Sequence, residues 1–419
     1  MNSDIKEKIE LIKEKKVPNG YKKSQVGVIP TEWNIRKLNS INTISTGLTP
    51  LRSKIEYFEG SIFWVKTTDL NNSNIYDTEE KITEIAMNET SLKYVEENSI
   101  LIAMYGGFNQ IGRTGLMKIK GTTNQAISSF HIDEKEYNSQ FILQWLNANR
   151  FYWRRLAASS RKDPNITKKD VEDFPIVKIP YLEQKRIAGM ISIWDKNIEL
   201  KENLLKERLR YKKGLMEILL TGKSRLSGFN EEVKFKKLKS YINEIKIKNK
   251  ENKEKRILSV TNKQGFILQE EQFDRIVASS DVSNYKIVKK GQFAYNPSRV
   301  NVGSLDLLTK FESGLLSPMY VIFECNDKLN KDYLHQFLKS NMFLNVIPRL
   351  LQGSVRDSLS FEALQQVKLF IPKLEEQRAI AKILKTSDKE IDLLKKEIEL
   401  LKEQKKGLMQ LLLTGIVRV

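Results

Sequence analysis

Two segments of the chain repeat apolar residues at intervals of mostly three, four and seven positions, which is typical of a helix that buries one stripe of its surface. The apolar positions of the first segment are Ile191, Trp194, Ile198, Leu205, Leu209, Leu215 and Leu219, and those of the second are Leu384, Ile391, Leu394, Ile398, Leu401, Leu408 and Leu412. Each pattern predicts a helix of about 38 residues, roughly 57 Å long at about 1.5 Å per residue. Two such helices should bury their stripes against each other.

One peptide closes both predicted helices, as KKGLMEILLTG at 212–222 and as KKGLMQLLLTG at 405–415. Its Thr-Gly pair is a stop signal, because glycine readily adopts the left-handed conformation that ends a helix. Lys212 and Lys405 fall at matching positions of the apolar seam, where we expect the seam to loosen. Gly214 and Gly407 are poor helix formers and are expected to mark a bend or a close approach.

The repetition extends over nearly the whole chain. Glu183-Gln184 and Asp195-Lys196 return 193 residues later as Glu376-Gln377 and Asp388-Lys389, and EWNIRKLNSI at 32–41 parallels EVKFKKLKSYI at 232–242. A repeat of this length is too long for a solenoid. The chain therefore consists of two copies of one unit, each a globular segment followed by a helix, and the duplication favours a pseudo-two-fold arrangement.

The globular segment of each copy mixes strand-like and helix-like runs. Strand-like runs lie at 61–67, 99–106 and 116–121 in the first copy and at 256–260, 291–296 and 319–325 in the second, and one helix-like run follows in each, at 139–157 and 331–351. Strands followed by a helix predict mixed α/β (α+β) domains in tandem. The expected parts are an N-terminal helix at 1–20, globular domains at 21–180 and 223–371, a long helix at 181–222, and a second long helix with the C-terminal tail at 372–419.

The chain is strongly basic, with 71 Lys and Arg against 52 Asp and Glu and a net charge of +19. Such a charge most often indicates a polyanionic ligand such as nucleic acid. The abundance of Lys, Ile and Asn also fits a compositional bias of a whole proteome, so the charge alone does not identify the ligand. The single cysteine, Cys325, excludes intramolecular disulfides and cysteine-based zinc sites.

The chain has no run of about 18 apolar residues, and its start, MNSDIKEKIE, is too charged for a secretory signal. We therefore expect a cytoplasmic protein without a membrane span.

No catalytic constellation is apparent. TGKS at 221–224 lacks the glycine that a nucleotide-binding loop needs five residues before its last glycine, where Glu217 stands. NPSR at 296–299 departs at its last two positions from the Asn-Pro-Pro-aromatic loop of adenine methyltransferases. The two histidines, His131 and His335, have no neighbouring carboxylate or cysteine cluster in the sequence, so no metal site is expected.

Several loops combine glycine, amide, aromatic and arginine residues, as nucleic-acid-binding surfaces do. They are MYGGFNQIGRTG at 104–115, TTNQA at 122–126 and SSRKDPN at 159–165 in the first copy, and YNPSRVNVGS at 295–304 and QGSVRDS at 352–358 in the second. Asn and Gln can read adenine edges, and Arg can read guanine. The candidate DNA contacts are Tyr105, Asn109, Gln110, Arg113, Asn124, Gln125, Arg161, Lys162, Asn165, Asn296, Ser298, Arg299, Asn301, Ser354 and Arg356. Any one of these loops could equally be an ordinary turn.

These motifs together resemble the DNA specificity subunit of type I restriction–modification systems over nearly the full length. The resemblance rests on VGVIPTEWNIRKL at 26–38, IPYLEQKRIA at 179–188, IPKLEEQRAIAKIL at 371–384 and the two KKGLM–LLTG peptides. GRTG and TNQA in the first copy, and NPSRVNVGS and LLSPMY in the second, are in the style of the same family. PYLEQ has one residue fewer than PKLEEQ, which predicts a local shift at the first junction between domain and helix.

The resemblance implies two target-recognition domains separated by two antiparallel, coiled-coil-like spacer helices. Each domain would read one half of a bipartite DNA site, and the helices would fix the gap between the halves. The subunit itself would be non-catalytic and would bind no cofactor. Two modification subunits would methylate adenine with S-adenosylmethionine, and two restriction subunits would supply ATP- and Mg²⁺-dependent translocation and cleavage.

Two other functions compete with this interpretation. A stand-alone DNA methyltransferase would transfer a methyl group without another subunit, but motifs for the methyl donor and for catalysis are not evident. A structural or regulatory DNA-binding protein would not co-purify with an adenine methyltransferase subunit, whereas a specificity subunit would.

Overall fold

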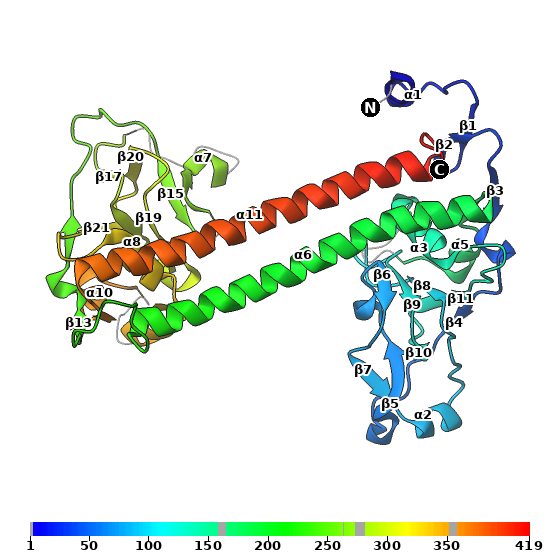
Figure 1. Cartoon of the computed structure of the whole chain (residues 1–419), viewed down its shortest axis with the longest axis horizontal. Coiled ribbons are helices and arrows are strands. Elements are labelled where there is room, and N and C mark those ends of the chain that lie inside the picture. Colours follow the sequence, from blue (N-terminus) through cyan, green and yellow to red (C-terminus); the bar gives the residue numbers. More distant parts are fainter. Residues whose placement is uncertain (1–2, 158–164, 263, 273–280, 352–357) are drawn as a thin grey trace. The chain divides into compact units, whose positions relative to one another are not determined.

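The computed structural model describes residues 3–157, 165–262, 264–272, 281–351 and 358–419 (Figure 1). The chain divides into two compact units, Met1–Leu200 with Ile398–Val419, and Lys201–Glu397. Each unit therefore combines one globular segment with half of each long helix.

The long helices α6 (Tyr181–Thr221) and α11 (Leu374–Leu413) contain 41 and 40 residues, close to the predicted length. In Figure 1, α6 is green and α11 is orange to red. Thr221 and Leu413 are followed closely by Gly222 and Gly415, whose φ angles of +71° and +69° lie in the left-handed region. The prediction that Thr-Gly ends each helix is therefore confirmed.

The first unit contains a five-stranded sheet in the order β4-β11-β8-β9-β6, in which only the β6–β9 pair is parallel. Its strands are β4 (Ser45–Thr46), β11 (Ile127–His131), β8 (Ser99–Ala103), β9 (Thr114–Met117) and β6 (Ser73–Ile75). A smaller sheet, in the order β10-β5-β7, has its own apolar core around Trp64 and Ile82. Its strands are β10 (Gly121–Thr123), β5 (Phe58–Val65) and β7 (Glu80–Ile82).

The remaining elements of the first unit frame these sheets. Two strand pairs are β1 (Tyr21–Ser24) with β2 (Gly27–Pro30) and β3 (Asn34–Lys37) with β12 (Pro175–Lys178). The short helices are α1 (Ser3–Lys13), α2 (Glu84–Glu89), α3 (Ser139–Ala148), α4 (Phe151–Ala157) and α5 (Lys168–Glu172), with 3₁₀ turns η1 (Leu38–Ser40), η2 (Ile55–Tyr57) and η3 (Thr67–Asp69).

The second unit is built from shorter sheets. A four-stranded antiparallel sheet has the order β14-β21-β18-β19, with β14 (Ile242–Ile245), β21 (Val321–Cys325), β18 (Phe293–Tyr295) and β19 (Leu305–Leu307). The strand pairs are β13 (Phe235–Lys237) with β22 (Lys368–Phe370), β15 (Leu258–Thr261) with β16 (Gly265–Leu268), and β17 (Lys286–Lys289) with β20 (Ser313–Leu316). The helices are α7 (Gln269–Gln272), α8 (Lys331–Leu338), α9 (Asn341–Leu351) and α10 (Phe361–Gln365), with 3₁₀ turns η4 (Leu238–Ser240) and η5 (Pro297–Val302). The predicted tandem of mixed α/β domains with two long helices is confirmed.

The helix-like runs at 139–157 and 331–351 are helical, but each is divided into two helices and does not form one. The first run divides into α3 and α4, and the second into α8 and α9. The physical reason is polar capping at the break. The Asn149 side chain donates to the carbonyl of Trp145 at 2.9 Å. The Ser340 hydroxyl donates to the carbonyl of Phe337 at 2.6 Å.

The repeated peptide packs into the core of the other copy's globular segment. In the first unit, Leu412 and Leu413 of α11 belong to the same buried cluster as Trp33 and Phe141. In the second unit, Leu219 and Leu220 of α6 belong to a cluster with Leu238 and Tyr333 of the globular segment. Each peptide thus contributes its leucines to the core of the other copy's globular segment.

Within each unit the two helices run antiparallel. In the second unit, Lys201, Arg208 and Lys212 of α6 pair in turn with Glu397, Glu390 and Asp388 of α11. The equivalent of the last pair in the first unit is Lys405 with Asp195. At these positions of the seam, an aspartate on the facing helix binds each lysine, so an ion pair takes the place of an apolar contact.

One expectation for the seam is wrong. Leu209 is 46% exposed and lies outside the seam, whereas Arg208 faces Glu390 with 2.9 Å between Nε and Oε1. A Cβ on Gly214 or Gly407 would meet no atom within 4 Å, so neither glycine marks a close approach, and the bend stays a prediction. The predicted shift at the first junction is present, since two residues separate β12 from α6 and three separate β22 from α11.

A buried ion pair recurs at the start of each long helix. Arg225, just after α6, donates from Nε and Nη2 to both carboxylate oxygens of Glu376 in the first turn of α11, at 2.7 and 2.5 Å. Arg418, just after α11, binds Glu183 of α6 in the same way, at 2.5 and 2.8 Å. The side chains of Glu376 and Glu183 are only 1% and 8% exposed. These hydrogen bonds raise the pKa of both arginines.

Replacing Arg225 with alanine should destabilise the second unit by about 3 kcal/mol or more, because Glu376 would stay buried without its partner. Lys223→Ala is the matched control, since Lys223 and Glu217 form a pair with side chains 62% and 60% exposed, and its loss should cost less than about 1 kcal/mol. Urea unfolding of both variants measures the difference. Equal midpoints for the two variants would contradict a structural role of the buried pair.

Candidate nucleic-acid interface

In the first unit, three of the loops predicted to bind DNA meet at Met104. The amide of Met104 donates to the carbonyl of Ala126 at 2.8 Å, and the carbonyl of Met104 accepts from the amide of Ile166 at 2.9 Å. The loop after β8, the turn before β11 and the stretch before α5 are therefore adjacent. They bring together seven candidates: Tyr105, Asn109, Gln110, Arg113, Asn124, Gln125 and Asn165.

The seven candidates differ in exposure and in the contacts they already make. Tyr105, Asn109, Gln125 and Asn165 are exposed, and Gln110, Arg113 and Asn124 are partly buried. The Asn124 side chain accepts from the amide of Ala126 at 3.2 Å and so stabilises its own turn. Arg113 Nε donates to the carbonyl of Asn109 at 3.0 Å. Asn124 and Arg113 thus have a structural role in addition to any contact with DNA.

The second unit places its candidate loop at the equivalent position. The amide of Leu359 donates to the carbonyl of Pro297 at 3.0 Å. These residues stand 193 positions after Ile166 and Met104, which form the same bond in the first unit. The loop is the 3₁₀ turn η5, on which Ser298, Arg299 and Asn301 are exposed.

One candidate of the second unit has a defined structural role. The Asn296 side chain accepts from the amide of Ser298 at 3.1 Å and caps η5. Gly303 ends the turn with φ +89°, and a Cβ there would lie 2.4 Å from the side-chain oxygen of Asn262. The turn between β15 and β16, which carries Asn262, is therefore part of this surface, although the sequence did not single it out. Arg161, Lys162, Ser354 and Arg356 lie outside the described residues.

Arg150 is another residue that the sequence did not single out. It lies between α3 and α4, within the helix-like run at 139–157. Its guanidinium donates to the carbonyls of Asn109 and Ile111, at 2.8 and 3.2 Å, and so braces the loop after β8. Burial lowers the pKa of Arg150, with a further contribution from Arg113 and Arg154. Three like charges therefore lie close to the candidate loop.

The segment before β5 also borders this surface. The hydroxyl of Thr49 donates to the side-chain oxygen of Gln125, and the amide of Leu48 donates to the carbonyl of Thr123 at 3.0 Å. Trp64 Nε1 in turn donates to the carbonyl of Leu48 at 3.2 Å. A single sequence gives no signal for this approach, because residues 48 and 123 are far apart in the chain and come together through the pairing of β4 with β11.

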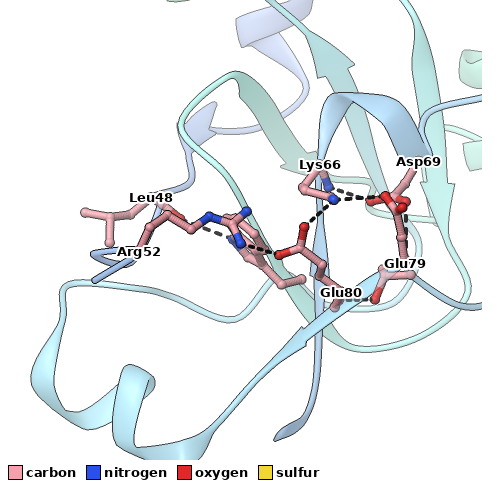
Figure 2. A network of polar contacts seen from close by, with 8 residues as sticks. Leu48, Arg52, Lys66, Asp69, Glu79 and Glu80 are labelled. Carbon is pink, nitrogen blue, oxygen red and sulfur yellow. Dashed lines mark hydrogen bonds and ion pairs between the residues drawn. The ribbon is translucent and has the colours of Figure 1, made fainter. Parts of the chain in front are cut away.

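A polar network holds the same segment (Figure 2). Arg52 binds Glu80 at 2.6 Å, and its guanidinium lies 5.0 Å from the centroid of the Trp64 ring. Lys66 binds Glu80 and Glu79 at 2.5 and 2.9 Å. The hydrogen bond from Arg52 holds the pKa of Glu80 below its usual value. Because both cations have carboxylate partners, we assign this network to positioning the segment and not to binding phosphate.

The described residues contain no group of three or more His, Cys, Asp or Glu side chains that could hold a metal ion. His335 does have a carboxylate partner that the sequence did not reveal, since its Nε2 lies 2.6 Å from Asp306 Oδ1.

Burial raises the pKa of Cys325, on β21, to about 12. No described helix is long and apolar enough to span a membrane.

Each unit has a groove between the C-terminal half of one long helix and the end of a short helix, α3 in the first unit and α8 in the second. The groove of the first unit has a volume of about 630 Å³ and that of the second about 560 Å³. Equivalent residues line them: Lys405, Lys406, Met409, Thr414 and Asn149 in the first, and Lys212, Lys213, Met216, Thr221 and Asn341 in the second. We call these the paired grooves.

Residues 30–209 and 229–403 match a family model described as the type I restriction modification DNA specificity domain. The type I restriction enzyme MjaVIII specificity subunit of Methanocaldococcus jannaschii is 25% identical, covering 93% of this chain and 94% of the relative. The EcoR124I/EcoR124II specificity subunit of Escherichia coli is 31% identical, and the match covers 44% of this chain and 46% of that relative.

Two solved structures have the same fold. The S subunit of a type I restriction–modification system from M. genitalium has a TM-score of 0.59 and 16% identity, and the match covers 91% of this chain and 96% of the other. A chain from a structure of a type I R-M system has a TM-score of 0.53 and 15% identity, with 93% and 99% covered.

Gly112→Ala should destabilise the first unit more than Gly107→Ala. Both glycines have positive φ, +66° and +72°, so alanine at either should cost about 1–2 kcal/mol. At Gly112 the new Cβ would also lie 2.1 Å from the Trp153 ring, which should add about 1–3 kcal/mol for overpacking, whereas at Gly107 it meets nothing. Denaturant unfolding compares the two variants. Equal stability would show that the loop does not rest on Trp153.

Proposed function

This chain belongs to the type I restriction modification DNA specificity family, and we propose that it recognises a bipartite DNA site, with one half read by the exposed loops of each unit. It is the non-catalytic DNA-recognition subunit of a type I complex. One observation supports a site with two halves: the backbone hydrogen bond from Ile166 to Met104 in the first unit has an equivalent from Leu359 to Pro297 in the second. Two loops at equivalent positions carry different side chains on the same framework.

The chemistry of the loops suits direct reading of bases. The first loop exposes Tyr105 and Asn109, and the second exposes Ser298, Arg299 and Asn301. Amides can pair with adenine and a guanidinium with guanine, so loops of different composition should select different bases. The net charge of +19 favours association with the phosphate backbone.

The paired grooves support the proposal that two modification subunits bind. A single partner type that binds twice needs two similar surfaces, and the grooves repeat lysine, methionine, threonine and asparagine at equivalent positions. Each groove contains a methionine, which adapts its shape readily to an apolar partner, and two adjacent lysines that favour an acidic neighbour. We place one modification subunit at each groove.

The cofactors in this proposal belong to the partners. The modification subunits would bring S-adenosylmethionine for adenine methylation, and two restriction subunits would bring ATP and Mg²⁺. The specificity subunit would act in the cytoplasm, where DNA and these cofactors are available. A DNA-binding protein without methyltransferase partners is the alternative, and the paired grooves favour the assembled complex over it.

Replacing residues 21–178 with the corresponding domain of another specificity subunit should change one half of the methylated motif and leave the other half unchanged. The reason is that the base-reading loops of each unit lie within its own globular segment. Sequencing modified adenines in DNA from cells that express the hybrid with its modification subunit gives the motif. A simultaneous change of both halves would refute independent reading.

Charge reversal in the paired grooves should remove modification subunits one at a time. Lys406→Glu and Lys213→Glu change exposed residues, so the fold should persist. Native mass spectrometry of the assembled complex should show loss of one modification subunit for each single variant and of both for the double variant. Lys93→Glu, an exposed lysine outside the grooves, is the control. Full assembly of the double variant would place the partner elsewhere.

A further inference from the structure

The loop after β8, residues 104–112, exposes two aromatic rings. Tyr105 and Phe108 are each 45% exposed, and Gly106 and Gly107 separate them. Within the described part of the chain, neither ring stacks on another aromatic ring or on a cation. A single exposed aromatic side chain is ordinary on a protein surface, so the exposure alone does not establish a role.

The backbone of this loop is braced on several sides. The amide of Gly112 donates to the carbonyl of Ala103, and that of Ala103 donates to the carbonyl of Arg113, at 2.9 and 2.8 Å. Ile111 is 1% exposed and anchors the loop in the core. Arg150 holds the carbonyls of Asn109 and Ile111 from below. Ordering such a loop on a ligand therefore costs little entropy.

Glycine is required on the exposed side of the loop. Gly106 has φ +106°, and a Cβ there would lie 2.7 Å from Cβ and 2.8 Å from Cγ of Gln110. The Gln110 side chain therefore packs against Gly106 and leaves no room for a side chain at that position. Gly107 has φ +72° with open space around it, which lets the chain turn between Tyr105 and Phe108.

Three arginines lie close to the backbone of the loop that carries the rings. Arg113 and Arg150 both bind carbonyls of this loop, and Arg154 is close enough to lower the pKa of Arg150, after burial and Arg113. The three guanidiniums would attract the phosphates on either side of any base pair that the loop approaches. Proteins that wedge an apolar side chain between stacked bases combine such a side chain with arginine or lysine residues that contact the DNA.

We propose that Phe108, with Tyr105 beside it, stacks against bases at one step of the half-site read by the first unit and opens that step. This inference rests on the proposed DNA-reading function and goes beyond it by assigning a distortion of the DNA. Phe108 has no polar atom with which to read a base edge, so stacking is its available contact. Opening one step lowers the energy needed to extrude a neighbouring adenine, which a base-modifying enzyme requires.

The proposal is asymmetric between the two half-sites. The equivalent loop of the second unit exposes Arg299 and Val302 and contains no aromatic residue. Valine, 59% exposed, is too small and lacks the flat face that stacks on a base. The half-site read by the second unit should therefore keep its stacking.

The test uses 2-aminopurine, an adenine analogue whose fluorescence rises when it loses stacking, placed at successive positions across both half-sites. The chain assembled with its modification subunits and without methyl donor should raise the fluorescence several-fold at one step of the first half-site only. Phe108→Ala should abolish the rise and weaken specific binding by about 5- to 100-fold, the loss expected for one base–aromatic stack. Phe108→Trp should retain both.

Two comparisons separate stacking from other causes. Tyr76→Ala removes another exposed aromatic ring of the first unit, 65% exposed, and should change neither signal. A mismatch at the affected step should restore the affinity of Phe108→Ala, because the mismatch already weakens the stacking that the ring would disrupt. Loss of a merely structural contact would not be rescued by a change in the DNA.

The outcomes distinguish this proposal from the function beneath it. Suppose that the complex with the wild-type chain binds its site specifically and that Phe108→Ala leaves the fluorescence profile unchanged. This result would overturn the stacking role and leave the DNA-reading function standing. A rise in the second half-site instead of the first would also overturn it. If the complex with the wild-type chain did not prefer DNA that contains its recognition motif over random DNA, the proposed function itself would be overturned.

Discussion

The buried ion pair between a glutamate at the start of one long helix and an arginine beyond the end of the other is the constraint on which the rest of the structure depends. Glu376 and Glu183 are almost inaccessible to solvent, and a carboxylate can be buried there only because Arg225 and Arg418 each bind both of its oxygens. Without these arginines, each carboxylate would stay buried and unpaired. The pair therefore fixes where the two helices lie against each other within each unit, and the apolar packing follows that register.

Two aspartates, one on each long helix, make further polar contacts that are equivalent in the two units. Asp195 accepts from Lys405 and from Gln144, and Asp388 accepts from Lys212 and Gln336. Each aspartate thus joins both long helices to a short helix of the globular segment, α3 in the first unit and α8 in the second. Because these contacts are made among residues of the framework, they leave the loops free to differ. This separation explains how one chain can repeat its framework closely while its two sets of exposed loops carry different side chains.

The same separation assigns different partners to different surfaces. The paired grooves are built from the repeated peptides, so they present similar chemistry twice. The loops around Met104 and Pro297 lie at equivalent positions but present Tyr105, Phe108 and Asn109 in one unit and Ser298, Arg299 and Asn301 in the other. A repeated surface suits one kind of partner bound twice, and divergent loops suit two different DNA sequences. The loop of the first unit is also held in place for reading DNA, because Arg113 and Arg150 donate hydrogen bonds to its carbonyl oxygens.

The sequence by itself determined the duplication, the two long helices, their Thr-Gly ends and most of the apolar seam, because these depend on local periodicity and on the conformational freedom of glycine. It also identified loops that the fold brings together in the first unit. It did not reveal that Lys212 and Lys405 are paired, that Arg208 replaces Leu209 in the seam, that Arg150 braces a candidate loop, or that Thr49 approaches Gln125. Those features depend on contacts between residues far apart in the chain, and only the tertiary structure decides them. A lysine in an apolar seam is disruptive or stabilising according to what faces it, and nothing within one helical period of the sequence specifies the facing residue.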